Sequence, residues 1–219
     1  MMNFNNIINN LPTYLLRIPV ILISLSAHEA AHGYVAYKFG DYTPKITGRI
    51  TLNPLKHLDP IGAICLLIFG FGWAKPVMVN FRNFKKPKRD MALTALAGPL
   101  ANLILGFLGM FIWILCFRFF PENNLTKAII FFLEIFYMLN IGLAVFNLLP
   151  IPPLDGSRIF FQFLPDKIYY FIMQYEKYIM IIMFVLLFLG VLDNVISFLV
   201  RMVAYGMFRI LFWLLPFVK

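Results

Sequence analysis

Two histidines four residues apart, with a glutamate directly after the first, are the residues of this sequence best suited to do chemistry. They lie in His28-Glu29-Ala30-Ala31-His32. On a helix, residues four apart share one face, so both imidazoles can bind one metal ion, and imidazole suits zinc. Glu29 lies about 100° further round the helix, where it can act on water without being a ligand. The pattern predicts a hydrolytic zinc site with His28 and His32 as ligands and Glu29 as general base.

The third protein ligand must come from elsewhere, because a catalytic zinc takes three protein ligands and keeps a fourth position for water. His57 is the one remaining histidine, and Asp59, Glu134 and Asp155 are the candidate carboxylates. We favour Asp155, because three prolines shortly before it break the helix. Irregular backbone at membrane depth is tolerated where it lines a watery cavity or is buried in protein. Glu134 lies near the end of its apolar segment that is far from Asp155, so its depth in the membrane does not match. His57, in a loop, stays an alternative ligand.

The metal motif lies in an apolar stretch, residues 11–39, whose only charged side chains are Arg17, Glu29 and Lys38. The whole chain of 219 residues is similarly apolar, with 61% hydrophobic residues, 13% charged residues and a mean hydropathy of +0.81. A soluble domain has about 25% charged residues, so much of this surface must face lipid. Polar groups in a membrane segment are costly and mark function. We therefore expect a metal site within or beside a bilayer.

Five apolar segments are long enough to cross a bilayer, which takes about 20 residues. Residues 61–73 form a sixth segment, which is only 13 residues long and contains three glycines. We interpret it as re-entrant, and a full crossing stays open. The fold class is therefore an all-α polytopic membrane protein with five to six transmembrane segments. The five long segments are residues 11–39, 91–117, 128–149, 168–192 and 195–217.

The basic residues of the loops predict the orientation, because Lys and Arg are enriched on the cytoplasmic side. If residues 61–73 enter and leave on one side, both flanks of this segment, residues 38–56 and 75–89, share a compartment and hold most of the loop Lys and Arg. The opposite side then has Arg118 and Lys127. We expect an outside N-terminus, a cytoplasmic C-terminus and a metal site toward the cytoplasm, in a cell membrane of prokaryotic type.

Charge and cysteine content exclude other classes of protein. The formal net charge of +9 is explained by the basic loops, so we expect membrane lipid and no nucleic acid as a partner. Cys65 and Cys116 both lie in apolar segments, which is not a disulfide framework. The start of the chain lacks a basic region, so we interpret residues 11–39 as a retained span and not as a signal peptide.

Four segments, in order, resemble the site-2 protease family of intramembrane zinc metalloproteases. Residues 28–32 match its zinc-binding helix, and residues 147–156, N-L-L-P-I-P-P-L-D-G, match its second motif. Residues 97–102, A-G-P-L-A-N, and residues 72–77, G-W-A-K-P-V, are similar to further segments of the family.

The resemblance implies how the chain is organised. Asp155 supplies the third zinc ligand, and a β-hairpin near residues 61–80 presents an exposed strand edge to the substrate. The spans within residues 168–217 are accessory. Residues 1–219 are expected to form a single membrane-embedded metalloprotease domain without an appended soluble module. The catalytic core comprises three segments, residues 11–39, 91–117 and 128–156.

The predicted activity is that of an intramembrane zinc endopeptidase. It hydrolyses peptide bonds in or near transmembrane segments of membrane proteins or signal-peptide remnants, so the expected partner is a transmembrane protein or peptide substrate. Three amides in or beside the core spans are candidates to bind the substrate backbone or to stabilise the oxyanion, namely Asn102, Asn140 and Asn147. Hydrogen bonding between helices is the other interpretation of these amides. The alternative function is a non-enzymatic zinc-binding membrane transporter or sensor, which leaves Glu29 without a role.

Overall fold

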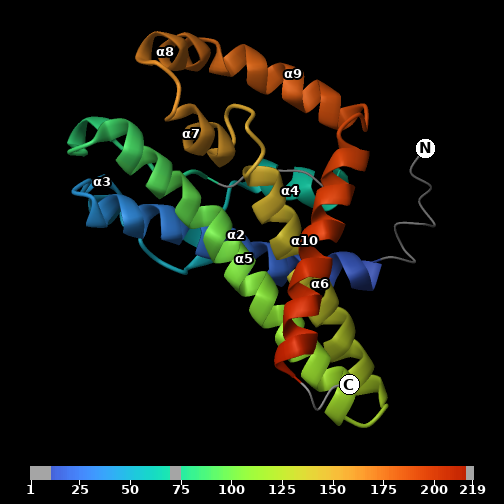
Figure 1. The fold of residues 1–219 in the computed structure, drawn as a ribbon. Coiled ribbons are helices and arrows are strands. Elements are labelled where there is room, and N and C mark those ends of the chain that lie inside the picture. The colour runs from blue at the N-terminus through green and yellow to red at the C-terminus, as the bar shows by residue number, and fades with distance from the viewer. Residues whose placement is uncertain (1–10, 70–74, 216–219) are drawn as a thin grey trace.

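Helices make up all the regular structure in the described part of the chain. The computed structural model describes residues 11–69 and 75–215. Figure 1 shows long helices in a bundle, shorter helices across one end, and a final helix along the side. The long core helices are α2 (Leu11–Lys38), α5 (Pro87–Phe119) and α6 (Asn124–Asn147). The other elements are α3 (Thr43–Ile46), η1 (Pro54–Lys56), α4 (Pro60–Phe69), η2 (Phe81–Asn83), α7 (Asp155–Phe161), α8 (Asp166–Gln174), α9 (Glu176–Phe188) and α10 (Asp193–Leu214).

The central helix is α5, which packs against both α2 and α6 (Figure 1). Two glycines on α5 allow α6 to approach closely. A Cβ on Gly106 would lie 3.0 Å from Ile141 Cγ1, and a Cβ on Gly109 would lie 2.7 Å from Phe136 Cδ1. Small residues recur at membrane-helix contacts because association there depends on close packing rather than on exclusion of water. The close fit fixes the register of α5 and α6, both of which carry residues of the site.

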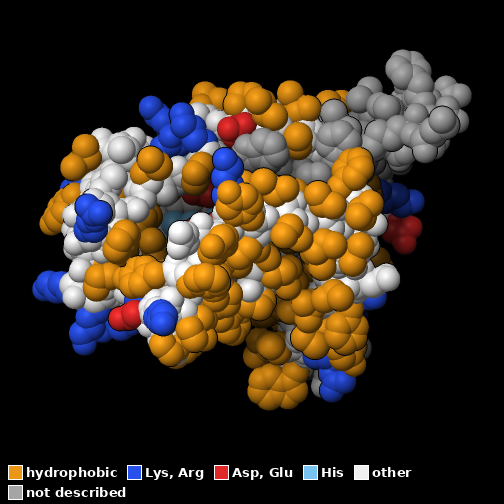
Figure 2. Space-filling view, turned by 90° about the horizontal axis from the view of Figure 1, so that it is seen from above, with side chains coloured by type: hydrophobic (Ala, Val, Ile, Leu, Met, Phe, Trp, Pro, Cys, Tyr) orange, Lys and Arg blue, Asp and Glu red, His pale blue; other side chains and the backbone are white. Residues whose placement is uncertain are grey.

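Three described helices are long and apolar enough to cross a membrane, namely α5, α6 and α10. The number becomes four if α8 and α9, which are bent by 61° relative to each other, count as one broken span. Figure 2 shows hydrophobic side chains (orange) covering much of one face, with most basic side chains (blue) toward its left and a few at its right and lower edges. These features are those of a multi-pass membrane protein.

The predicted five to six spans are not confirmed. The segment predicted as residues 168–192 is broken at Tyr175, between α8 and α9. The 13 residues of α9 extend over about 20 Å, which is less than the hydrocarbon core of about 30 Å. Although α2 forms one helix of 28 residues over the predicted first span, it is not among the three crossing helices identified in the described residues.

The segment predicted to contain a re-entrant stretch and a β-hairpin, residues 61–80, is described in two parts. Its first part belongs to α4, whose 10 residues are too few to cross a bilayer. Residues 70–74 lie outside the described part, and residues 75–80 have no regular secondary structure. The described ranges contain no β-strand, so the hairpin is not confirmed.

The last helix, α10, runs along α6 toward the far end of the bundle (Figure 1). Leu211 and Leu215 there join a buried apolar cluster with Met110 of α5 and with Ile141 and Val145 of α6. The helices α8 and α9 instead lie across the opposite end, next to α7. That opposite end contains the metal motif.

Candidate metal centre

Two residues of α2 and the first residue of α7 meet in one group. The Nε2 atoms of His28 and His32 lie 3.0 Å apart, and each lies 3.2 Å from Asp155 Oδ2. Ligand atoms held at about 2.0–2.1 Å around a tetrahedral zinc are separated by about 3.3 Å. Each of the three residues offers a ligand atom within 4.8 Å of the others, so their spacing fits a single cation.

With neutral imidazoles, no proton lies between these three atoms. His32 Nδ1 lies 2.7 Å from the backbone oxygen of Thr94, and His28 Nδ1 lies 2.6 Å from Asn102 Oδ1. Both partners are acceptors, so each Nδ1 carries the ring proton and each Nε2 presents a lone pair. Asp155 Oδ2 is buried and has no hydrogen-bond partner among the described residues. Three such atoms repel one another unless a cation lies among them, so the group fits a metal.

The carboxylate of Asp155 is the third member of the group. The site thus offers two imidazole nitrogens and one carboxylate oxygen as ligand atoms. This set is among those found in catalytic zinc sites.

The backbone of α5 approaches the two histidines at Gly98, in the A-G-P-L-A-N segment. A Cβ at this position would lie 2.4 Å from His32 Nε2 and 2.6 Å from His28 Cε1. Any other residue would displace the imidazoles. Thr94 and Asn102, one turn before and one turn after this glycine, accept the hydrogen bonds from the two rings.

Asp155 reaches the histidines because the chain turns sharply after α6. Residues 148–154 form this turn, and Asp155 is the first residue of α7. Gly156 packs directly on the turn, since a Cβ there would lie 2.3 Å from the backbone oxygen of Leu148. The proline-rich motif thus ends α6 and returns the chain toward α2.

The other candidate ligands lie away from the centre. His57 is buried, with its Nε2 2.8 Å from the backbone oxygen of Thr51. Asp59 accepts backbone hydrogen bonds at the start of α4, and Glu134 is an exposed residue of α6. None of the three belongs to the group of ligand atoms found in the described residues.

Glu29 lies beside the ligands and contacts residues 75–80. Its Oε2 accepts a hydrogen bond of 2.8 Å from the backbone N–H of Val77, and it lines the same cavity as the three ligands. Val77 also packs on the helix that carries the motif, because a Cβ on Gly33 would lie 3.5 Å from Val77 Cγ1. The carboxylate is therefore oriented by a backbone donor next to the metal group.

Residues 75–80 are also attached at both ends. The backbone N–H of Lys75 donates to the carbonyl of His57 at 2.9 Å, and the backbone N–H of Asn80 donates to Asp41 Oδ2 at 2.7 Å. Asp41 lies just after the turn that ends α2 and is completely buried. This non-regular segment is thus held alongside the metal-binding helix at three points.

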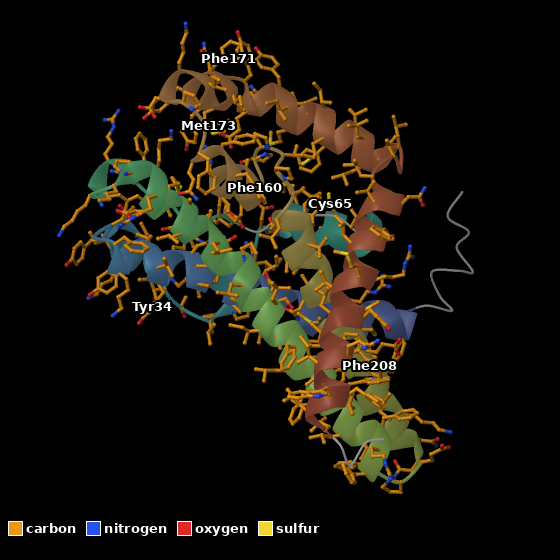
Figure 3. The ribbon with its side chains drawn as sticks, viewed as in Figure 1. Tyr34, Cys65, Phe160, Phe171, Met173 and Phe208 are labelled. Carbon is orange, nitrogen blue, oxygen red and sulfur yellow. The ribbon has the colours of Figure 1, made fainter. Side chains whose placement is uncertain are left out.

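An open cavity of about 1470 Å³ leads from the metal group toward the C-terminal helices. Apolar side chains of α9 also line it, among them Met180, Met183 and Phe184. Arg158 of α7 also lines the cavity and donates to both carboxylate oxygens of Glu176, each at 2.8 Å. Its guanidinium also contacts Met173 Sδ, a residue that lies on the side of α8 toward α7 (Figure 3).

The three predicted amides occupy different places. Asn102 and Asn140 are completely buried and do not line the cavity. Asn102 Nδ2 donates to Asn140 Oδ1 at 2.9 Å, so these two residues join α5 to α6 and follow the helix-to-helix interpretation rather than a substrate contact. Asn147 does line the cavity, and its Nδ2 donates to the carbonyl of Leu143 at 2.9 Å. A direct role beside a substrate therefore stays a prediction for Asn147 alone.

Comparison with known proteins agrees with this geometry. The sequence model of Peptidase family M50 matches residues 117–190, which include the proline-rich motif and Asp155. The chain is 47% identical to the "Putative zinc metalloprotease YwhC" of Bacillus subtilis over 168 residues, which cover 76% of this chain and 77% of the relative. The chain belongs to peptidase family M50, the site-2 proteases. It is therefore a metalloprotease, a hydrolase of the membrane.

Other relatives of this M50 protease carry similar names. Rip2 of Mycobacterium tuberculosis is 34% identical over 62% of this chain and 52% of the relative. Zinc metalloprotease MJ0392 of Methanocaldococcus jannaschii is 28% identical over 74% of this chain and 38% of the relative. The chain thus spans about half or less of these two relatives. No solved structure matches it significantly.

Several residues that shape this M50 site were not singled out from the sequence. Gly98 stands within a noted segment, and a glycine between two site residues on one helix is a signal that backbone must pass close to them. Val77 also stands within a noted segment, but its role comes from its backbone N–H, which residue type does not reveal. Asp41 carries no such signal, because it is an acid next to a turn.

Proposed function

We propose that this M50 protease is an intramembrane zinc endopeptidase whose metal is held by His28, His32 and Asp155. The observation that carries the proposal is the convergence of His28 Nε2, His32 Nε2 and Asp155 Oδ2 at separations of 3.0–3.2 Å. When bound there, zinc would polarise the scissile carbonyl and make water a competent nucleophile near neutral pH.

The chain's own acid and base chemistry falls to Glu29. Its carboxylate accepts the proton of the attacking water and returns that proton to the leaving amine nitrogen. The hydrogen bond from Val77 N–H to Oε2 supports this role because it fixes the position of one carboxylate oxygen beside the metal group.

The substrate in this proposal is a transmembrane protein or a signal-peptide remnant whose helix is locally unwound. An unwound peptide needs new partners for its N–H and C=O groups, and an extended segment offers them. Residues 75–80 suit this task because Val77 and Val79 line the cavity and the segment is fixed at three points. Edge-on pairing of residues 75–80 with the substrate backbone belongs to the same proposal. The cavity of about 1470 Å³ exceeds the about 300–1,000 Å³ of small-molecule pockets.

The proposed orientation puts the metal centre toward the cytoplasmic side of a prokaryotic cell membrane. The N-terminus is then outside and the C-terminus is cytoplasmic. The end of α5 near the centre starts at Pro87 among basic residues, whereas its other end has Arg118 alone in the last turn. This distribution follows the positive-inside rule. Membrane lipid is a partner on the same reasoning, and nucleic acid is not.

Hydrolysis by Glu29 can be tested with a Glu29→Gln variant and a matched Glu134→Gln variant, whose carboxylate is exposed on α6. Both proteins are purified as full chains, their zinc content is measured, and they are expressed in membranes whose peptides are compared by mass spectrometry. We expect Glu29→Gln to bind zinc and to lose cleavage, while Glu134→Gln keeps both.

Two outcomes would contradict the proposed function. Undiminished cleavage by zinc-loaded Glu29→Gln would remove the general base from the account. A wild-type protein that cleaves no membrane peptide but carries zinc across vesicles would favour the transporter or sensor alternative.

A further inference from the structure

The two histidines of the centre are oriented by different kinds of acceptor. His32 Nδ1 faces the backbone carbonyl of Thr94, which can only accept a hydrogen bond. His28 Nδ1 faces the side-chain oxygen of Asn102. A side-chain amide has an oxygen on one side and an NH₂ group on the other, so reversing it would offer His28 a donor instead. The orientation of the Asn102 side-chain amide therefore decides which ring nitrogen of His28 carries the proton.

The partners of Asn102 leave it only one orientation. Its Nδ2 donates to the backbone carbonyl of Ser24 at 3.2 Å and to Asn140 Oδ1 at 2.9 Å. Since a carbonyl never donates, the NH₂ group of Asn102 must face Ser24. Its oxygen is then left for His28.

The orientation of Asn140 is fixed in the same way. Its Nδ2 donates to the backbone carbonyl of Phe136 at 2.9 Å, one turn earlier on α6. Its Oδ1 therefore points to Asn102 as an acceptor. Both amides have no exposed surface, so water cannot replace a lost partner, and a reversed amide would set two acceptors or two donors against each other.

We propose that Asn102 and Asn140 are positioning residues that lock His28 in the tautomer with its proton on Nδ1. This proposal rests on the zinc site proposed above. We call the chain of hydrogen bonds from the Phe136 carbonyl through Asn140 and Asn102 to His28 the relay; it links α6, α5 and α2. It keeps the lone pair of His28 Nε2 toward Asp155. Outer partners of metal-binding histidines act in this way on ring orientation and ligand strength.

The relay is tested by zinc affinity in the full chain, purified in detergent and titrated with Zn²⁺ against a competing chelator. We expect Asn102→Ala to weaken zinc binding by about 10–100-fold, as is typical for loss of such a partner. Asn102→Asp keeps an oxygen for His28 but sets its second oxygen against the acceptors Ser24 O and Asn140 Oδ1, so it should recover only part of that loss. Asn140→Ala should lie between wild type and Asn102→Ala, because the Ser24 carbonyl still restrains Asn102.

A packing control separates this role from a general loss of structure. Ile141 is completely buried next to Asn140, and it packs where a Cβ on Gly106 would lie 3.0 Å from it. Ile141→Ala should lower the melting temperature through its cavity and leave zinc affinity unchanged. If Asn102→Ala does not fold, the comparison of Asn102→Asp, Asn140→Ala and Ile141→Ala carries the test.

Three results would count against the account, each at a different point. Wild-type zinc affinity in Asn102→Ala, or in Asn140→Ala where Asn102→Ala does not fold, would overturn the relay while leaving the zinc site intact. Equal weakening by Ile141→Ala would also overturn it, because the effect would then come from packing. A wild-type chain that binds no Zn²⁺ would instead overturn the proposed function on which the relay rests.

Discussion

The metal centre and the helix α9 that faces it across the cavity are built from opposite kinds of contact. Around the centre, short directional hydrogen bonds link α2, α5 and α6, and the amides Asn102 and Asn140 are fully buried. The helix α9 instead presents thioether and aromatic side chains such as Met180, Met183 and Phe184 to the cavity. It makes few close backbone contacts with other helices.

The polar contacts of α9 are more exposed to water than those of the metal centre. Its first residue, Glu176, pairs with Arg158, and the two side chains are 28% and 24% exposed. Such a pair contributes little stability because water competes for it. Buried amides near the centre have no such competition.

The contrast shows how the two tasks of a protease differ. A metal-binding constellation must be held to within about 0.5 Å, which only fixed hydrogen bonds and bare backbone provide. A cavity that accepts segments of differing sequence needs apolar, adaptable walls, and methionine suits such walls because its side chain is flexible. Changes at the centre should therefore act on zinc binding, and changes at α9 should act on the substrate.

Gly98→Ala should produce the largest effect at the centre. Its new methyl group would lie 2.4 Å from His32 Nε2, so we expect zinc affinity to fall by more than the about 10–100-fold that loss of an outer hydrogen bond costs, with cleavage lost as well. Zinc titration and a cleavage assay measure this. Gly206→Ala on α10 is the matched control, since a Cβ there meets nothing within 4 Å. Equal zinc affinity in both variants would break the claim that backbone shapes the centre.

Asp41 links the rigid centre to the segment at residues 75–80. Burial alone would raise its pKa, but hydrogen bonds from Thr43, Asn83 and the Asn80 N–H hold the pKa below the ordinary 3.8. A lowered folded-state pKa gives stability that is present above 3.8 and lost as pH falls through the folded value.

We therefore expect Asp41→Asn to lose about 1–3 kcal/mol of stability near neutral pH, through poorer hydrogen bonding. The difference in melting temperature from wild type should shrink as pH falls below 3.8. Thermal unfolding across a pH series measures this. A difference in melting temperature that stays constant, or grows toward low pH, would contradict a stabilising role for the ionised Asp41 carboxylate.

Glu176→Gln should have the smallest effect on stability, about 0–1 kcal/mol, because the pair with Arg158 is partly exposed. Since this pair holds α9 at the cavity, we expect KM for a transmembrane peptide to change while zinc affinity stays at the wild-type value. Asp166→Asn, whose carboxylate is 74% exposed in its pair with Lys88, should alter neither quantity. A loss of zinc affinity in Glu176→Gln would contradict the division between the two regions.

The sequence predicts the ligands of the centre because their chemistry is local. His28 and His32 need only helical spacing, and Asp155 follows from the proline-rich motif that the family resemblance recognises. The partner of each buried amide is not local in this sense. A polar residue in an apolar span must find some partner, but only the packing of α5 on α6 shows that Asn102 and Asn140 bond to each other.

The predicted spans differ from the observed helices for a related reason. Hydropathy averages over a segment, so it does not register the bend at Tyr175, where no proline or glycine marks the break between α8 and α9. Gly98 and Val77 act through backbone atoms, which composition does not reveal. Features of this M50 protease that depend on side-chain type can thus be predicted from the sequence, whereas features that depend on close backbone contacts cannot.

The central claim is that one zinc ion is bound by His28, His32 and Asp155. X-ray absorption at the zinc edge, on the full chain purified in detergent, tests it most directly. The account predicts one zinc per chain with two imidazole nitrogens at about 2.0–2.1 Å, oxygen ligands at about 2.0–2.2 Å and no sulfur. In Asp155→Ala the two imidazoles should remain while affinity falls. Zinc bound through cysteine sulfur, or a wild-type spectrum unchanged in a His28→Ala, His32→Ala double variant, would contradict it.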